Sequence, residues 1–219
     1  MDDEDLVALL FMLAGGFFLY RLLQQSRFAT ASSSPVFAPQ APGTWIPSAP
    51  IDRTLDLLMP QTVSPAGQAF IKQQEGFDVT VGRDAGNPVI GWGHDIVPSD
   101  PALIAAGVDQ ASVMAGNPIN QQQGQEIFDY DLAGITTTIG NEVIVPLTQS
   151  QFDALADLIF DIGKNAFRRS TLLADLNDGD YAAASEQFAV WNKSKGKVSQ
   201  VLANRRALET QMFSGQGTS

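Results

Sequence analysis

Two carboxylates, Glu75 and Asp84, flank the point where the sequence changes from helical spacing of apolar residues to short apolar runs with glycines. Glu75 ends a stretch with apolar residues at helical spacing, and Gly76 lets the chain turn there. Asp84 follows nine residues later, among short apolar runs and glycines. A helix end and a neighbouring hairpin can present two carboxylates across a cleft. Cleavage of a glycosidic bond needs such a pair, because one group protonates the leaving oxygen while the other activates water or stabilises positive charge.

Composition excludes several other chemistries. The chain has no cysteine, which excludes disulfides and thiolate sites, and its one histidine, His94, makes a multi-histidine metal site impossible. No serine stands in a Gly-x-Ser-x-Gly turn, and the acidic residues 175, 178 and 180 do not fit a calcium-binding loop. We therefore expect no metal and no cofactor. The formal net charge of −11 also argues against a nucleic-acid partner.

The elements that must position the two carboxylates follow from periodicity. A helix is predicted from Ala66 to Glu75, with Ser64 and Pro65 as cap and first turn. Short strands and turns are predicted over 77–95, with residues 86–88 connecting two strands. Beyond Pro101 the pattern is helical, over the segments 121–132, 148–162, 170–176, 181–191 and 199–213. A segregated β part beside a helical bundle predicts an α+β fold.

Two groups of charges near the C-terminus also allow predictions. Arg205 and Arg206 lie one helical turn before Glu209, so we expect at least one internal ion pair with it. Lysines 193, 195 and 197 are interpreted as a solvated loop, although contact with anionic wall peptides or phospholipid stays open.

The uncharged, apolar composition of the N-terminal residues predicts a membrane anchor. Residues 6–20 carry no charge, and the run extends to residues 6–23 if Arg21 snorkels. Eighteen helical residues reach about 27 Å, just short of a hydrocarbon core of about 30 Å. A buried helix or a cleavable signal peptide are the alternatives, although a signal peptide rarely starts with four acids. We assign residues 1–28 to the anchor, 29–63 to a Pro/Ser/Ala-rich linker and 64–219 to the catalytic domain.

The spaced motifs of residues 64–214 resemble phage-type lysozymes, family 24 of the glycoside hydrolases. The residues that carry this resemblance are Glu75-Gly76-Phe77, Asp84, Ile90-Gly91-Trp92-Gly93-His94, Asp131-Leu132, 146–155, Phe160, Gly163, 170–173, Phe188, Trp191 and 202–209. The resemblance implies a lysozyme-like fold, with a small β-sheet lobe and a helical lobe. It also implies a muramidase that cleaves the β-1,4 bond between N-acetylmuramic acid and N-acetylglucosamine.

By the same resemblance, Glu75 is the general acid and Asp84 the second carboxylate. The family's water-positioning threonine falls on Val89, which cannot hydrogen-bond. Either Asp84 positions water unaided, the enzyme is slow, or it is a lytic transglycosylase that needs no water. A weakened, wall-binding structural virion protein is a further alternative.

Three more residues are candidates for contact with substrate. Trp92 either stacks on sugar rings or is buried in its strand, and Phe167 either lines the cleft or packs in the core. His94 either contacts substrate or has a packing or ion-pair role near the cleft, which is the preferred interpretation.

The expected partners are bacterial peptidoglycan, a lipid membrane through residues 6–23 and, as a further candidate, other virion proteins. The family is chiefly viral, so a phage origin is expected. Acids before the span and Arg21 and Arg27 after it place the body on the cytoplasmic side. That orientation favours a virion with an internal membrane, while a host inner-membrane enzyme facing the wall is the alternative location.

Overall fold

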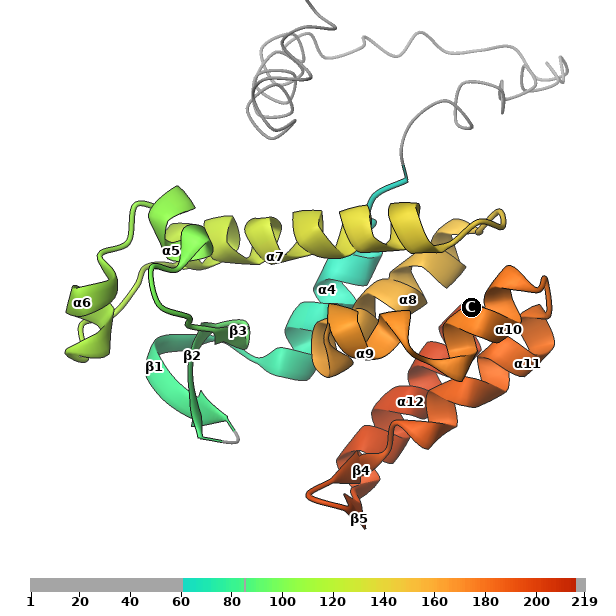
Figure 1. The fold of residues 1–219 in the computed structure, drawn as a ribbon. Coiled ribbons are helices and arrows are strands. Elements are labelled where there is room, and N and C mark those ends of the chain that lie inside the picture. The colour runs from blue at the N-terminus through green and yellow to red at the C-terminus, as the bar shows by residue number, and fades with distance from the viewer. Residues whose placement is uncertain (1–60, 85, 216–219) are drawn as a thin grey trace, which may run out of the picture. The chain divides into compact units, whose positions relative to one another are not determined.

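The computed structural model describes residues 61–84 and 86–215, all within one compact unit, Asp52–Ser219. The predicted anchor, and the predicted linker up to residue 60, lie outside the described residues. Among the residues that are described, no helix is both long and apolar enough to cross a membrane. The described chain has an α+β fold, a small antiparallel sheet beside a larger set of helices (Figure 1), which confirms the predicted fold class.

The small sheet has three antiparallel strands in the order β1-β2-β3. They are β1 (Asp78–Asp84), β2 (Asn87–Gly91) and β3 (His94–Asp95). Residues 87 and 88 were predicted to connect two strands, but they form the start of β2, where Asn87 pairs with Asp84. The reversal is shorter than expected because Gly86 turns the chain with a φ of +99°.

The described chain also contains a series of helices, one of them much longer than the others. They are α4 (Pro65–Glu75), α5 (Pro101–Ala105), α6 (Gln110–Met114), α7 (Gln121–Glu142), α8 (Gln149–Ile162), α9 (Lys164–Arg168), α10 (Thr171–Asn177), α11 (Tyr181–Glu186), the 3-10 turn η1 (Gln187–Val190) and α12 (Gln200–Phe213). Figure 1 shows α7 running along one side, with α5, α6 and the sheet near its first half and the later helices near its second half.

The predicted cap at Ser64 is confirmed, and other helices begin in the same way. Ser64 accepts a hydrogen bond from the N–H of Gly67 and begins α4, while Thr148 and Ser170 cap α8 and α10 in the same way. The predicted lysine loop, in contrast, is a short hairpin of β4 (Lys193–Ser194) and β5 (Lys197–Val198). Lys195 and Gly196 turn it with φ angles of +51° and +77°.

Two hydrophobic clusters form the core. The larger one joins α4, α7, α8 and the C-terminal helices, with Phe128, Leu155 and Phe188 among its buried members. The smaller one joins β2, α5, α6 and the start of α7. Phe77, directly after α4, packs against both clusters, so the end of α4 is held where they meet. Glu75 is placed at that junction.

Candidate active site

Glu75 is the last residue of α4, and its two carboxyl oxygens have different surroundings. The chain leaves the helix at Gly76, whose φ of +72° few other residues adopt. The Glu75 side chain is 20% exposed, and its Oε1 accepts a 2.6 Å hydrogen bond from Arg205 Nη1. Oε2 faces Gly93, where an added Cβ atom would lie only 3.0 Å from it. One oxygen is therefore anchored, and the other lies against bare backbone.

Burial gives this carboxyl the property that a general acid needs. Burial raises the pKa of Glu75 above its ordinary value, because the charged form loses solvation. Arg205 opposes this rise through its charge and hydrogen bond, while the negative charges of Asp161 and Asp157 add to it. The net direction is upward, so Glu75 keeps its proton to higher pH than a solvated glutamate does.

The arginine that anchors Glu75 belongs to a buried group of charges between α8 and α12. Arg205 donates two hydrogen bonds to Asp157, from Nε at 3.0 Å and from Nη2 at 2.8 Å. Arg206 Nη1 lies 2.9 Å from Asp161 Oδ2, and its Nη2 donates to Glu209 Oε1 at 2.7 Å. The predicted ion pairing with Glu209 is confirmed. The contacts to α8 and to Glu75 were missed, although two acids four residues apart on the apolar helix α8 were a usable signal.

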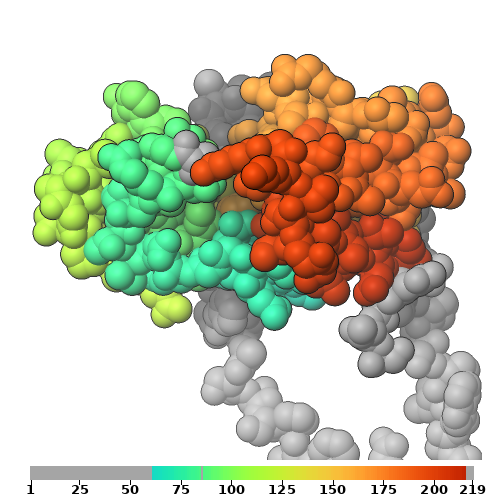
Figure 2. Space-filling view, turned by 90° about the horizontal axis from the view of Figure 1, so that it is seen from below, coloured from blue at the N-terminus to red at the C-terminus, as the bar shows by residue number. Residues whose placement is uncertain are grey.

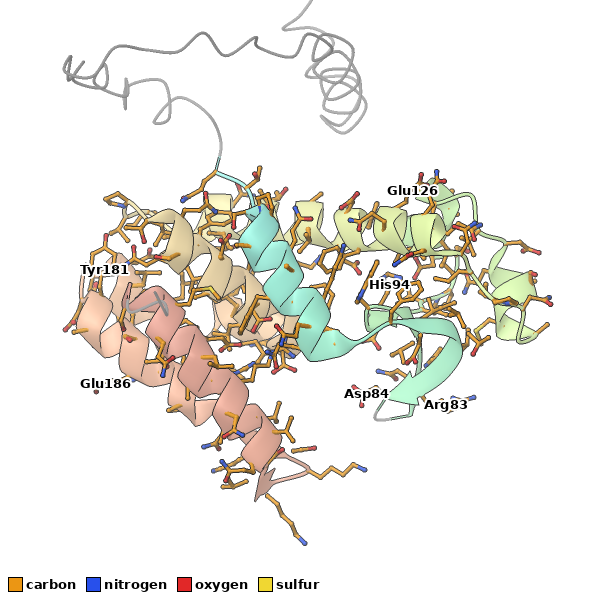
Figure 3. The ribbon with its side chains drawn as sticks, turned by 180° about the vertical axis from the view of Figure 1, so that it is seen from behind. Arg83, Asp84, His94, Glu126, Tyr181 and Glu186 are labelled. Atoms are coloured by element: carbon orange, nitrogen blue, oxygen red, sulfur yellow. The ribbon has the colours of Figure 1, made fainter. Side chains whose placement is uncertain are left out.

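Asp84 lies at the far end of β1 and is exposed. Figure 3 shows it beside Arg83 at the tip of the β1–β2 hairpin, on the side of the sheet away from α7. Within the described chain, the hydrogen bond of Glu75 goes to Arg205 and not to Asp84. Burial and, after it, the negative charge of Asp84 raise the pKa of Asp95, so these two carboxylates are electrostatically close.

Val89 occupies the position where the family resemblance has its water-positioning threonine. It lies in β2 opposite Gly82 of β1 and Asp95 of β3, and its side chain is buried at 9% exposure. Its Cγ2 would lie 3.6 Å from a Cβ atom placed on Gly82, so the two positions face each other. A valine here offers methyl groups and no hydrogen bond.

Two of the candidate substrate contacts are core residues in this structure. Phe167 is 0% exposed and belongs to the larger cluster, which leaves its ring no surface open to a substrate. Trp92 is 9% exposed, with its ring centroid 4.5 Å from that of Phe77 and 5.5 Å from that of Phe128. Core packing, which the sequence allowed for both, accounts for these positions.

His94 bridges two carboxylates. Its Nδ1 lies 2.8 Å from Asp131 of α7, and its Nε2 lies 3.0 Å from the fully buried Asp100 that caps α5. Figure 3 shows His94 between the sheet and α7. Burial alone lowers the pKa of His94, but the hydrogen bonds and charges of Asp131 and Asp100 outweigh it and raise the pKa. These contacts are those expected of a packing or ion-pair role.

A pocket of about 220 Å³ lies beside Gly93. Its walls combine an apolar base with charged groups, and its lining is Gly93, His94, Asp95, Asp131, Ile135, Ile159, Phe160, Gly163 and Lys164. Figure 2 shows the surface hollowed between the sheet and the part that carries β4 and β5. Gly93 lines this pocket and also faces Glu75 Oε2, so the pocket and the acid have Gly93 as a common neighbour. No group of three or more possible metal ligands occurs among the described residues.

Sequence comparison finds relatives among phage endolysins. The endolysin of Salmonella phage P22 is 38% identical over 152 residues, which cover 69% of this chain and 97% of that protein. The endolysin of Acyrthosiphon pisum secondary endosymbiont phage 1 is 35% identical, with the same coverage of 69% and 97%. The SAR-endolysin of Escherichia phage Mu is 43% identical over 91 residues, 42% of this chain and 53% of that protein.

Solved structures of a phage lysozyme and of a muramidase domain are also similar to this chain. A P22 lysozyme mutant superposes with a TM-score of 0.57 at 37% identity, over 69% of this chain and 97% of that one. The muramidase domain of SpmX from Asticaccaulis excentricus has a TM-score of 0.58 at 29% identity, over 70% and 97%. The sequence profile of phage lysozymes matches residues 72–209, more than half of the chain. The chain therefore belongs to the phage lysozyme family.

Proposed function

We propose that the chain is a peptidoglycan hydrolase, a muramidase that cleaves the β-1,4 bond between N-acetylmuramic acid and N-acetylglucosamine. The observation that carries this proposal is the state of Glu75. Burial raises its pKa, Arg205 anchors one of its oxygens, and the other faces Gly93, which lines the pocket. The names of the relatives, endolysins and a muramidase domain, support the same activity.

In this mechanism, Glu75 donates its proton to the glycosidic oxygen as the bond to the anomeric carbon breaks. Asp84 is the second carboxylate, which stabilises the positive charge that develops on the sugar or activates the attacking water. Its place at the tip of the hairpin requires the substrate to lie between β1 and the end of α4. His94, at the pocket wall, is a candidate contact to the sugar.

Because residue 89 is a valine, the mechanism leaves open whether water or a hydroxyl of the sugar itself attacks after the glycosidic bond breaks. A threonine hydroxyl can hold a water molecule, but the buried valine cannot. Hydrolysis therefore requires Asp84 to position water alone. The competing activity is lytic transglycosylation, in which the C6 hydroxyl of the muramic acid attacks in place of water and a 1,6-anhydro product forms. The buried apolar side chain of Val89 is the observation that favours transglycosylation as the second candidate activity.

Digestion of purified peptidoglycan by the full-length chain, with mass spectrometry of the products, tests both activities. Reducing-end muropeptides are expected from the muramidase, and exclusively 1,6-anhydro products would replace it with the transglycosylase. Glu75→Gln is the control and should lower product release by about 100-fold or more, since it removes the general acid. Wall binding without any product would contradict both activities and leave a binding module.

We propose further that residues 6–23 anchor the enzyme in a membrane and that residues 29–63 link this anchor to the catalytic domain. The uncharged run of residues 6–20 supports this, and some relatives are named SAR-endolysins. The full chain should sediment with membranes and need detergent for release, whereas a chain that starts at residue 29 should not. Release of the full chain by high salt alone would contradict a spanning anchor.

A phage origin fits the endolysin relatives, and two locations follow from it. The charges around the span favour an internal virion membrane with other virion proteins as partners, and a host inner membrane facing the wall is the alternative. Protease protection of the catalytic domain in inverted membrane vesicles separates these: a domain on the cytoplasmic side is digested, and a periplasmic one is protected.

A further inference from the structure

A buried carboxyl that the mechanism does not use lies behind Glu75. Glu209 of α12 is 0% exposed, as is Asp157 of α8. Among the described residues, four acids, Glu75, Asp157, Asp161 and Glu209, meet two cations here, Arg205 and Arg206. If every group were ionised, the acids would exceed the cations by two charges, and the excess is most unfavourable at the fully buried Asp157 and Glu209.

The contacts of Glu209 indicate where a proton relieves this excess. Its Oε1 accepts a 2.7 Å hydrogen bond from Arg206 and lies 3.6 Å from Arg205 Nε. Its Oε2 is buried and receives no hydrogen bond from any donor in the described chain. Arg205 Nε lies 3.0 Å from Asp157 Oδ2 and 3.6 Å from Glu209 Oε1, so the two buried carboxyls face the same nitrogen. Two buried carboxylates that share one cation repel each other, and a proton on one of them removes that repulsion.

The two arginines contact the two carboxyls unequally. Asp157 accepts two charge-assisted hydrogen bonds from Arg205, at 2.8 and 3.0 Å. Glu209 receives one, from Arg206. Burial, followed by the neighbouring Asp157 carboxylate, raises the pKa of Glu209 to about 10. The proton therefore belongs on Glu209 at neutral pH.

We propose that Glu209 is a positioning residue for the reaction: it stays protonated, donates its proton to a hydrogen bond with Asp157, and so fixes the carboxylate that holds Arg205 against Glu75. The proposed hydrogen bond from Glu209 on α12 reaches Asp157 on α8, and the observed contacts continue from Asp157 to Arg205 on α12 and from Arg205 to Glu75 at the end of α4. This inference deepens the proposed function and rests on the role of Glu75 as the acid.

The protonation of Glu209 can be tested without any activity measurement. Carbon-13 labels in the Asp and Glu carboxyls report protonation by NMR, and the infrared C=O band of a carboxylic acid reports it independently. At neutral pH we expect a protonated carboxyl signal that survives in Glu75→Gln and disappears in Glu209→Gln. Loss of the signal in Glu75→Gln alone, with no change in Glu209→Gln, would overturn the proposal.

The positioning role is tested by the pH profile. Glu209→Gln keeps a neutral hydrogen-bond donor, so kcat and its pH dependence should stay close to those of the wild-type enzyme. Glu209→Leu removes the donor and should lower kcat about 10-fold or more through misplacement of Arg205, with little change in KM. Glu142→Gln, at the surface ion pair with Arg168, is the matched control and should change neither.

Two results would contradict the positioning role. If Glu209→Gln moves the pH profile of kcat to lower pH, Glu209 acts as an anion near Glu75 and not as a donor. If Glu209→Leu folds and retains full kcat, Arg205 does not depend on the proton. Should the wild-type chain cleave no peptidoglycan, the proposed function fails, while the NMR and infrared results still decide whether Glu209 holds a proton.

Discussion

At the scale of single residues, the site depends on what touches each oxygen of Glu75. Oε1 is held by Arg205, and Oε2 has room only because residue 93 lacks a side chain. An acid that is anchored through one oxygen keeps its geometry while the other oxygen transfers the proton. In the proposed mechanism, the glycine at position 93 therefore matters through its missing Cβ atom as much as through its backbone angle.

Gly93→Ala, compared with a control glycine, should separate the effect of the missing Cβ atom from that of the backbone angle. The φ of +78° makes any side chain there unfavourable by about 1–2 kcal/mol, and the new Cβ atom would press on Glu75 Oε2 at 3.0 Å. We expect a lower free energy of unfolding and a kcat reduced about 10-fold or more. Urea unfolding and initial rates of peptidoglycan digestion measure the two quantities.

Gly179→Ala is the matched control for that substitution. Its φ is +82°, and nothing lies within 4 Å of the added Cβ atom. The same loss of stability is expected with no loss of kcat. Equal kcat values for the two variants would show that crowding at Oε2 is unimportant.

Asp161→Asn should change the pH dependence of the reaction. The charge of Asp161 contributes to the raised pKa of Glu75, so its removal lowers that pKa. Since the mechanism needs protonated Glu75, activity falls as pH rises through this pKa, and the fall should begin at lower pH in the variant. Asn has nearly the same size and shape as Asp, which limits the structural change. An unmoved alkaline limb of kcat/KM would show that another group controls it.

Sequence alone identified some of these residues for physical reasons. Glu75, Asp84 and His94 lie in short local motifs, and Arg206 is a helical neighbour of Glu209. The pairing of Arg205 with Asp157 joins residues 48 positions apart, and its pairing with Glu75 spans 130 positions. Such contacts are set by how helices pack, and periodicity within one helix carries no information about them.

At the scale of elements, α7 shows both the strength and the limit of periodicity. Its start was predicted correctly, but it continues from the predicted end, Leu132, to Glu142. The added segment contains three threonines and two glycines, which are weak helix formers. Ile135 and Ile139 nevertheless bury one face of it in the larger cluster, and that packing outweighs the local preference.

Two glycines of α7 should respond to alanine with opposite signs. At Gly124 a Cβ atom would lie 2.3 Å from Phe77 Cε2, so Gly124→Ala should overpack this contact and lower the free energy of unfolding by about 1–3 kcal/mol. At Gly140 nothing lies within 4 Å, and alanine should stabilise the helix by about 0.5–1 kcal/mol. Thermal and urea unfolding measure both. A stabilising Gly124→Ala would mean that Phe77 moves aside easily.

At the scale of the whole molecule, the sheet must stay fixed on the helices for Glu75 and Asp84 to act on one substrate. Phe77 packs against both hydrophobic clusters, and His94 supplies the polar part of the same junction. Through Asp131 the imidazole ties β3 to α7, and through Asp100 it ties β3 to the start of α5. Asp100 is itself held by the N–H groups of Val97, Ala102 and Leu103, so the junction is rigid on that side.

His94 should make the stability of the whole domain depend on pH. Its pKa is raised in the folded chain, so the folded state binds the proton more tightly than the unfolded state does. The added stability is fully present below the ordinary histidine pKa of 6.5 and is lost as pH rises through the folded value. His94→Gln should lower the free energy of unfolding by about 3 kcal/mol under acidic conditions, because it leaves the buried Asp100 without its cation.

Urea unfolding of both chains between about pH 5 and 9 measures this dependence. The difference between the wild-type chain and His94→Gln should shrink as pH rises, and Asp131→Asn, which keeps the Asp100 contact, should show a smaller dependence than the wild-type chain. Because His94 is the one histidine of the chain, no other imidazole can produce the effect. A difference that stays constant with pH would mean that His94 is uncharged in the folded protein, and that hydrogen bonding alone joins the sheet to the helices.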